Sequence, residues 1–410
     1  MRRAATLTIF GASLFFPFVA CEDESSKQQQ VGFDAGPQPT VDASLPDTAV
    51  ADANVPDEGI DAPDAAPPAA LIAITIGAGT MPPSFGTSFD GKSWVKPKQI
   101  GTDEYGAVGG GVVFLPSGRG LAVERENGAG SNMSATWSQG TWSTLAPFGT
   151  GAISYVSAPI ATATGARAVD QPGSGLPVLR VYDFDDATSK WSAADPTALS
   201  ANNQSVPAIV ATQAGSSLVL GAGDTSYMWT QKTGATWSAP LPIVGVTKPT
   251  DSPAAMVAVR RAGASQIVAA FTHEAGFAAL EVYGAVFDGV WSTPVLLGTN
   301  VAVSSITPYA IVAQADGTVA LAYATESGTI KLGFFSGTAW SAFQDIPGIT
   351  ASPQYGPVGL ARGIGGASLE LVFLDTNVHL AHSRFNGTWS PPVVIDPDHD
   401  VVKVTLASNR

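Results

Sequence analysis

The densest group of side chains that could ligate a metal ion is the segment DPDHD, residues 396–400. Asp396, Asp398 and Asp400 stand at alternate positions, which is how calcium-binding loops present oxygen ligands. The segment lacks the central glycine and the distant bidentate glutamate of the EF-hand pattern. It predicts either a weak calcium site or, the interpretation that we favour, a solvated loop before the last strand. No other cofactor is indicated.

The four histidines of the chain are poorly placed to share a metal ion. His379 and His382 lie three apart in an expected strand, so their side chains point to opposite faces of the sheet. We expect one to face solvent and the other to pack in the sheet. His273, next to Glu274, falls in an expected loop between two strands. The histidines therefore predict no metal centre.

Sequence motifs of catalysis are also missing. The chain has no GxSxG elbow, no HExxH motif and no phosphate-binding glycine loop. A glycosidase needs two carboxylates on either side of a pocket, and the sequence nominates no such pair. We expect a protein that is not an enzyme, with a glycosidase-like enzyme as the least favoured alternative.

Two tryptophans, Trp137 and Trp229, are the candidate ligand-binding residues. An exposed indole face can stack on the C–H side of a pyranose ring, and polar neighbours can bond its hydroxyl groups. Ser138, Gln139 and Gln231 are such neighbours. Packing in the core is the alternative fate of a tryptophan in a strand.

These residues belong to a chain that repeats one phrase seven times: a turn, usually with a glycine, then a tryptophan, often followed by serine and proline. Clear copies are FDGVWSTP (287–294) and FNGTWSPP (385–392). The repeated tryptophans are Trp94, Trp142, Trp191, Trp237, Trp291, Trp340 and Trp389. Their spacing of 46 to 54 residues is typical of blade-like β repeats rather than helical solenoids.

Short apolar runs separated by turn residues fill each interval. Residues 309–346, for example, divide into YAIVAQADG, TVALAYATESG, TIKLGFFSG and TAWSAFQDI. Four antiparallel strands per repeat predict the blade of a β-propeller. The Asp288–Gly289 and Asn386–Gly387 dipeptides suit tight hairpins from the third strand to the fourth. Each tryptophan then opens the outer strand, where its ring can fill the gap between blades.

The two ends of the repeat region complement each other. Residues 70–77 and 82–91 supply two strands before Trp94, so the first blade lacks its innermost strand. The apolar run DVVKVTLAS (400–408) is left over after the last blade. We therefore expect an all-β fold in which residues 70–410 form a seven-bladed β-propeller of four-stranded antiparallel blades. The C-terminal strand closes the first blade.

The N-terminal residues 1–20 have the features of a signal peptide, with Arg2 and Arg3 before an apolar run too short to cross a bilayer. The sequence VAC (19–21) resembles the lipobox of bacterial lipoproteins, although Phe18 stands where that family usually has leucine. The resemblance implies that Cys21 is lipidated and becomes the mature N-terminus. It predicts a protein anchored in the bacterial cell envelope, at the outer membrane, facing the periplasm or the surface. An ordinary signal peptide is the alternative.

Residues 21–69 are rich in Asp, Ala and Pro, and residues 22–70 hold eleven acidic side chains against one lysine. Such a segment predicts a disordered, extended tether. The formal charge of the whole chain is −14, of which residues 71–410 carry −6, from 17 basic and 23 acidic residues. An acidic domain argues against a nucleic-acid partner.

The repeat resembles that of bacterial β-propellers, including seven-bladed fucose-binding lectins and, more loosely, the Asp-box repeats of sialidases. Its best match to the Asp-box pattern Ser-x-Asp-x-Gly-x-Thr-Trp, SFDGKSW (88–94), is one residue short. No set of arginines suggests a carboxylate clamp, so sialidase activity is disfavoured. The resemblance implies a binding module for a glycan or another exposed ligand. A structural platform for envelope proteins is the alternative.

Overall fold

In the computed structural model all described residues belong to the second of two units, Asp61–Arg410. The structure describes residues 70–77, 83–101, 110–125, 131–149, 153–173, 178–200, 206–212, 216–249, 254–274, 280–302, 309–353, 358–363 and 369–409. The expected signal peptide 1–20, and the expected tether 21–69 with Cys21, lie outside these residues. The described residues form strands and no helix, so none of their elements is a helix that could span a membrane.

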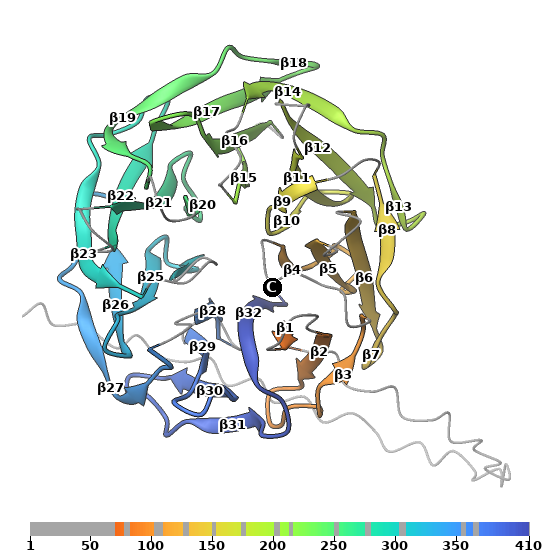
Figure 1. The fold of residues 1–410 in the computed structure, drawn as a ribbon, viewed down its shortest axis with the longest axis vertical. Coiled ribbons are helices and arrows are strands. Elements are labelled where there is room, and N and C mark those ends of the chain that lie inside the picture. Colours follow the sequence, from red (N-terminus) through yellow and green to blue (C-terminus); the bar gives the residue numbers. More distant parts are fainter. Residues whose placement is uncertain are drawn as a thin grey trace, which may run out of the picture. The chain divides into compact units, whose positions relative to one another are not determined.

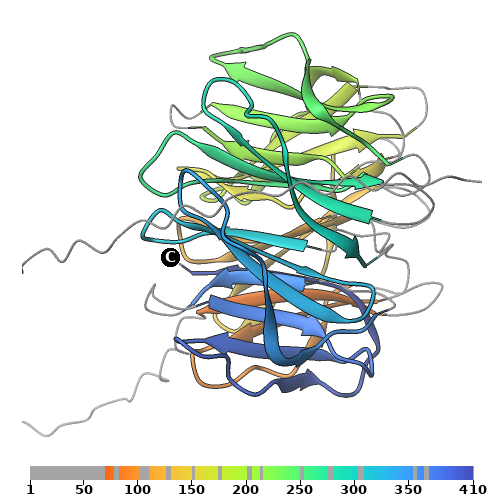
Figure 2. The same ribbon diagram turned by 90° about the vertical axis from the view of Figure 1, so that its left-hand side faces the viewer.

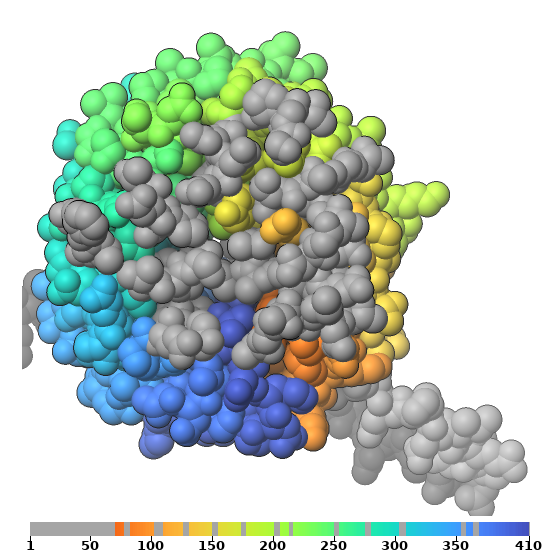
Figure 3. All heavy atoms as spheres, in the orientation of Figure 1, coloured from red at the N-terminus to blue at the C-terminus, as the bar shows by residue number. Residues whose placement is uncertain are grey.

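The strands of the second unit form seven antiparallel sheets arranged around a central axis (Figure 1). Figure 2 shows the same sheets from the side, and in the space-filling view of Figure 3 the colours follow one another around the rim in sequence order. Sheets that are consecutive in sequence are therefore neighbours in space. The predicted seven-bladed, all-β propeller is confirmed.

We number the blades in chain order and give their strands from the axis outward. Blade 1 comprises β32 (Val401–Ser408), β1 (Leu71–Gly77), β2 (Ser84–Phe89) and β3 (Lys98–Gln99). Blade 5 comprises β20 (Met256–Arg260), β21 (Ile267–Glu274), β22 (Leu280–Phe287) and β23 (Val295–Val301). Blade 6 comprises β24 (Tyr309–Ala313), β25 (Val319–Ala324), β26 (Thr329–Phe335) and β27 (Gln344–Thr350). Blade 7 comprises β28 (Val358–Arg362), β29 (Leu369–Leu374), β30 (Leu380–Phe385) and β31 (Val393–Asp396).

In blades 2, 3 and 4 a two-residue strand comes before the outermost strand, and both pair with the strand inside them; in blade 3 the innermost strand is also divided, into β9 and β10. Blade 2 comprises β4 (Gly111–Phe114), β5 (Gly120–Arg125), β6 (Asn132–Ser138), β7 (Thr141–Trp142) and β8 (Ala146–Phe148). Blade 3 comprises β9 (Ile153–Val156), β10 (Ile160–Ala161), β11 (Gly165–Pro172), β12 (Val178–Asp185), β13 (Lys190–Trp191) and β14 (Asp195–Ser200). Blade 4 comprises β15 (Ala208–Ala211), β16 (Ser217–Ala222), β17 (Ser226–Thr233), β18 (Thr236–Trp237) and β19 (Leu241–Thr247).

The ring closes through the C-terminal strand, as the sequence predicts. β32 pairs antiparallel with β1, and the register places Leu71 opposite Ser408, Ile74 opposite Thr405 and Ile76 opposite Lys403. Figure 1 shows the two strands side by side although they come from opposite ends of the described chain. Blade 1 is therefore the only blade whose strands come from both ends of the described chain.

The core lies between the blades. The second strands, such as β16 and β25, are buried at every residue, whereas β19 and β27 on the outside bury only every third residue. One hydrophobic cluster joins blades 4 and 5, another joins blades 6 and 7, and a third joins blades 1 and 2. Because both faces of an inner strand pack against neighbouring blades, its sequence is a continuous apolar run.

Candidate functional site

The repeated phrase forms the turn between the third and fourth strands. Gly289 and Gly337 have φ values of 83° and 108°, a backbone conformation that glycine adopts without strain. Blade 3 has no glycine in its copy, and Ser189 takes the positive φ there, at 54°. The blade 3 turn therefore keeps a residue with positive φ although its sequence departs from the repeated phrase.

The tryptophan after each turn packs across the seam onto the preceding blade. Trp340 of blade 6 lies on β22 of blade 5, where a Cβ atom at Gly284 would be 3.0 Å from the indole Nε1. Trp142 of blade 2 covers Gly86 of blade 1 in the same way, with ring atoms 2.6 Å from a Cβ at that glycine. The expected role of the repeated tryptophan, to fill the gap between blades, is confirmed at these seams.

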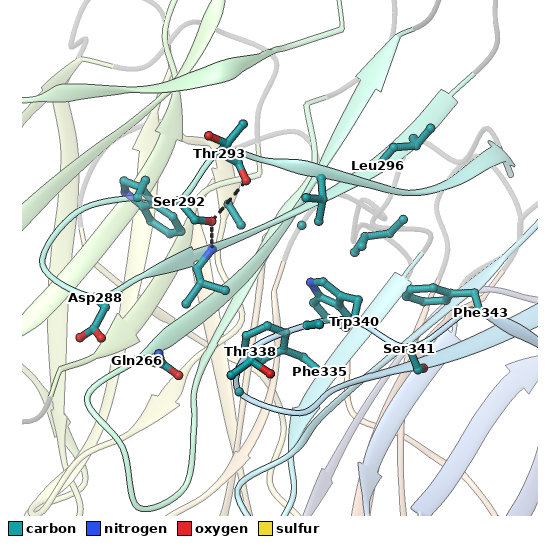
Figure 4. Close-up of a pocket in the computed structure, with 18 of the residues that line it drawn as sticks. Gln266, Asp288, Ser292, Thr293, Leu296, Phe335, Thr338, Trp340, Ser341 and Phe343 are labelled. Carbon is teal, nitrogen blue, oxygen red and sulfur yellow. Dashed lines mark hydrogen bonds between the residues drawn. The ribbon is translucent and has the colours of Figure 1, made fainter. Parts of the chain in front are cut away.

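The seam between blades 5 and 6 opens outward into a cleft of about 850 Å³, which we name the 5/6 cleft (Figure 4). Its walls are β22, the turn and the start of β23 in blade 5, and the turn of blade 6. Three partly exposed aromatic rings line it: Trp291, Trp340 and Phe343. The volume and the aromatic lining suit a ligand of the size of a small oligosaccharide.

Some polar groups of the 5/6 cleft hold the turns in place. The Ser292 hydroxyl accepts a hydrogen bond from the Val286 amide at 3.0 Å and donates to the Thr293 carbonyl at 3.3 Å (Figure 4). Ser341 does the same in blade 6, accepting from the Phe334 amide at 3.0 Å. These hydroxyls support the walls of the cleft.

Other polar groups remain open to a ligand. Thr338 is exposed at the tip of the blade 6 turn, and Asp288 is exposed at the tip of the blade 5 turn. Ser265 donates to one Asp288 oxygen at 3.1 Å, which leaves the other oxygen to accept from a ligand. Asp288 is the single ionisable residue among those that line the cleft. A single carboxylate and a threonine hydroxyl can form hydrogen bonds with the hydroxyl groups of a ligand, but they do not supply the separate acid and base that proton transfer needs.

The structure does not support the two tryptophans chosen from sequence as ligand platforms. Trp137 is 5% exposed and packs in the core with Ile72 and Phe114, so its ring face is covered and the alternative of core packing applies to this residue. Trp229 is half-buried, packs against the core of blades 4 and 5, and meets Phe287 edge-on with ring centroids 5.0 Å apart. Neither ring lines the 5/6 cleft.

The three aspartates of the calcium hypothesis do not converge. Asp396 is 1% exposed and lies 3.0 Å from Nδ1 of His399, whereas Asp398 forms an exposed ion pair with Lys96 at 2.8 Å. Asp400 is exposed. Within the described ranges no group of three or more acidic, histidine or cysteine side chains could hold a metal ion. The sequence favours a solvated loop over residues 396–400, but Asp396 is the buried last residue of strand β31, and only residues 397–399 form the bend that leads to the last strand.

The histidines have structural partners. His382 is buried, and its Nε2 lies 2.9 Å from Oε2 of Glu370 in the neighbouring strand. His379 is half-buried rather than solvent-exposed. His273 is the next-to-last residue of strand β21 rather than part of a loop, and its Nδ1 lies 3.0 Å from the Thr247 hydroxyl oxygen.

Sequence analysis missed a buried pair of ionisable side chains at the seam between blades 1 and 2. Lys403 and Ser84 both pair with Ile76, so they share one face of the blade 1 sheet. The Ser84 hydroxyl donates to Oε2 of Glu124 in blade 2, which places that carboxylate on the same seam. Glu124 is 1% exposed and Lys403 is 2% exposed.

Burial sets the chemistry of this pair. It raises the pKa of Glu124 and lowers the pKa of Lys403 to about 8, and each charge partly offsets the shift of the other. Within the described residues, Nζ of Lys403 and Oε1 of Glu124 have no hydrogen-bond partner. Lys403 also lines an axial cavity of about 240 Å³ between the innermost strands of all seven blades. That volume is below the range typical of ligand pockets.

Comparisons with known proteins establish the fold. No family model matches the chain, and no curated protein matches it. A putative 6-phosphogluconolactonase from Bacteroides uniformis is similar with a TM-score of 0.53 and 13% identity, over 82% of this chain and 99% of that one. A second, from Bacteroides fragilis, has a TM-score of 0.51 and 10% identity, over 82% and 98% of the two chains.

Fucose-binding lectins are also among the similar structures, as the repeats suggest. The Aleuria aurantia lectin in complex with Fucalpha1-6GlcNAc has a TM-score of 0.48 and 11% identity, over 72% of this chain and 97% of that one. The same lectin is described as a six-bladed β-propeller, whereas the described residues of the present chain form seven sheets. At these identities the comparisons show the propeller fold, and the ligand has to be argued from the site.

Proposed function

We propose that this protein is a non-enzymatic glycan-binding module of the bacterial envelope. The observation that carries the proposal is the 5/6 cleft, which combines about 850 Å³ of volume with three partly exposed aromatic rings. Sugar rings have an apolar C–H side that packs on an aromatic face and hydroxyl groups that need hydrogen-bond partners. Asp288 and Thr338 offer such partners at the two rims of the cleft.

The lining of the cleft favours binding over hydrolysis. A glycosidase commonly uses two carboxyl groups on opposite sides of the scissile bond, about 5–10 Å apart. Among the described residues that line the 5/6 cleft there is one carboxylate, Asp288, and no second acid to share the reaction. A bound sugar would therefore be held without being cleaved.

A glycan array probed with the mature protein tests this function. Thr338→Ala and Asp288→Asn change exposed side chains of the cleft, so we expect folded proteins whose affinity for the array hits falls about three- to tenfold, the loss of one hydrogen bond. Thr388→Ala is a matched control, because Thr388 follows the turn glycine of blade 7 as Thr338 does in blade 6. If no glycan binds, or if binding is unchanged in both cleft variants, the proposal is wrong.

Anchoring by lipid is the second part of the proposal, and it is supported by the sequence around Cys21. We expect Cys21→Ala to move the protein from the membrane fraction to the soluble fraction, because the chain has no other cysteine that could carry the lipid. Fractionation of cells that express each form measures this. Retention of the Cys21→Ala form in the membrane would contradict a lipid anchor.

A structural platform remains the second candidate function, because apolar side chains are exposed on the outer strands of blades 4 and 5. Val244 is 78% exposed and Val290 is 76% exposed, and Leu241, Val295 and Leu296 are about half exposed. Exposed apolar side chains that gather into one patch are typical of protein contacts. Affinity capture from envelope extract, repeated with Val244→Lys, separates this function from glycan binding, because Val244 is not among the residues that line the 5/6 cleft.

A further inference from the structure

A second cleft, of about 860 Å³, opens between blades 3 and 4 and uses the same repeated turn as the first. We name it the 3/4 cleft. One wall is the end of β12, the turn and β13, which correspond to residues 286–292 at the 5/6 cleft. The other wall contains Thr212 and Ser217 of blade 4, and Arg260 reaches in from blade 5. The 3/4 cleft and the 5/6 cleft are therefore formed in part by corresponding residues of the repeat.

The two clefts differ in charge. The ionisable residues that line the 3/4 cleft are three cations and two carboxylates: Arg167, Lys190, Arg260, Asp183 and Asp185. Their formal charge is +1, from three positive and two negative groups, whereas Asp288 gives the 5/6 cleft a formal charge of −1. Residues 71–410 carry a formal charge of −6, so the formal charge of +1 at this cleft is a local excess of positive charge.

Arg167 and Asp183 neutralise each other. Nε of Arg167 donates to Oδ1 of Asp183 at 2.5 Å and Nη2 donates to Oδ2 at 3.0 Å, a bidentate pair. The remaining Nη1 donates to the Ser217 hydroxyl at 2.6 Å. Because their charges offset each other, Arg167 and Asp183 add little net charge to the lining of the cleft.

Asp185 is committed to its own turn. Its Oδ1 accepts hydrogen bonds from the Thr188 amide and the Thr188 hydroxyl, both at 2.7 Å. The carboxylate therefore caps the turn that precedes Lys190. It does not pair with either of the two other cations of the cleft.

Lys190 and Arg260 are the cations that remain for a ligand. Within the described residues, the exposed Lys190 ammonium has no hydrogen-bond or ion-pair partner. Arg260 is exposed and makes one long contact, from Nη1 to the Thr212 carbonyl at 3.4 Å. The rest of its guanidinium is free to donate in a bidentate manner to a carboxylate or a sulfate.

We infer that the 3/4 cleft binds an anionic saccharide, whose carboxylate or sulfate is drawn to Lys190 and Arg260. Neutral hydroxyl groups of the same ligand meet Thr162, Thr164 and Thr212, which line the cleft between the charged groups. Trp191 gives an apolar edge, since its other face stacks on Phe148 with ring centroids 3.9 Å apart. This inference rests on the proposed function and adds a second ligand class to it.

The test is an array of matched pairs, in which each hexuronate-terminated or 6-O-sulfated oligosaccharide is printed beside its neutral parent. We expect the mature protein to bind anionic members about tenfold more tightly than their parents in low salt, the gain of one charge-assisted hydrogen bond. The preference should weaken as salt is raised, because exposed charges are screened. Carboxylated and sulfated probes identify which of the two anions fits.

Variants assign the preference to the cleft. Lys190→Gln and Arg260→Gln each remove one exposed cation, and each should abolish most of the tenfold preference without changing the binding of neutral glycans. Lys92→Gln is the matched control, because Lys92 is an exposed lysine in the corresponding turn of blade 1. It should leave the preference unchanged.

The outcomes separate the two proposals. Binding of neutral and anionic members with equal affinity, or a preference that survives both cleft variants, overturns the inference and leaves the glycan-binding function standing. An array on which no member of any pair binds overturns both. A preference lost in Lys190→Gln and Arg260→Gln and retained in Lys92→Gln supports both.

Discussion

The seam between blades 1 and 2 and the seam between blades 5 and 6 come from the same repeat, but they solve the packing problem differently. In the first, Glu124 and Lys403 are buried with oxygen and nitrogen atoms that lack partners in the described chain. In the second, the Trp340 ring lies on Gly284 and the seam opens into a cleft. The seam that includes the C-terminal strand therefore buries ionisable side chains, whereas the seam between blades 5 and 6 is formed by apolar packing.

In this repeat fold the seam that closes the ring and the seam that forms the candidate ligand site are different seams. The blade 1 sheet is completed by a strand from the far end of the chain, so it depends on the register between β32 and β1. Blade 5 is continuous in sequence and can present exposed rings without risk to closure.

Deletion of residues 400–410 removes β32 and leaves β1 as an unpaired edge of blade 1. It also uncovers apolar side chains such as Ile72 and Ile74, which are at most 1% exposed. At about 25 cal/mol per Å², several hundred Å² of uncovered apolar surface amounts to the whole stability of a domain. We expect aggregation, or a Tm far below that of the intact protein, in thermal unfolding. A truncated protein that unfolds normally would show that β32 does not close the ring.

We expect the free energy of unfolding to depend on pH in a way that reflects the burial of Lys403. The pKa of Lys403 falls from 10.5 to about 8 on folding, so between these values the unfolded chain holds a proton that the folded chain has released. Stability from this group therefore rises as pH increases from 8 to 10.5, by at most about 3 kcal/mol. Urea unfolding of wild type and Lys403→Met across this range isolates the effect. Parallel pH profiles for the two proteins would contradict it.

Glu124 changes the free energy of unfolding with pH in the opposite direction to Lys403. Its pKa is raised on folding from 4.5, so the folded protein holds a proton that the unfolded chain has lost just above that value. Its contribution to stability is largest at low pH and is lost as pH rises through the raised pKa. The pair as a whole therefore weakens the seam most at intermediate pH.

Trp340→Ala tests the aromatic seam. The ring is half-buried and covers Gly284, so its loss opens a cavity between blades 5 and 6. We expect a loss of about 2 kcal/mol, below the 3–5 typical of fully buried tryptophans. Glycan binding in the 5/6 cleft should fall with it, while binding of anionic saccharides in the 3/4 cleft should persist. Chemical unfolding and the matched array measure the two effects.

The smallest effect concerns the double variant Glu124→Gln with Lys403→Met. It removes both buried charges and keeps side chains of similar size, a change that is often neutral or stabilising. We expect a gain of about 1 kcal/mol, because the glutamine oxygen can still accept from Ser84. Each single variant should be less stable than the double variant, since it leaves one buried charge alone. A double variant that is much less stable than wild type would show that the charges stabilise the seam.

Much of the fold follows from local chemistry that the sequence displays directly. The spacing of the repeated tryptophans, the turn glycines and the unpaired run DVVKVTLAS were enough to predict seven blades and their closure by the C-terminal strand. Turn geometry depends on a few adjacent residues, and a repeat presents the same local signal seven times. Propeller closure then follows by counting strands at the two ends.

The sites required the tertiary structure. Trp137 and Trp340 both stand in or beside strands, and only the placement of the neighbouring blade buries the first and leaves the second partly exposed. Glu124 meets Lys403 across a seam between distant parts of the chain, and Arg260 of blade 5 lines a cleft that begins in blade 3. Burial and charge pairing depend on which blades become neighbours and on how closely they pack, and these are properties of the closed ring rather than of any one repeat.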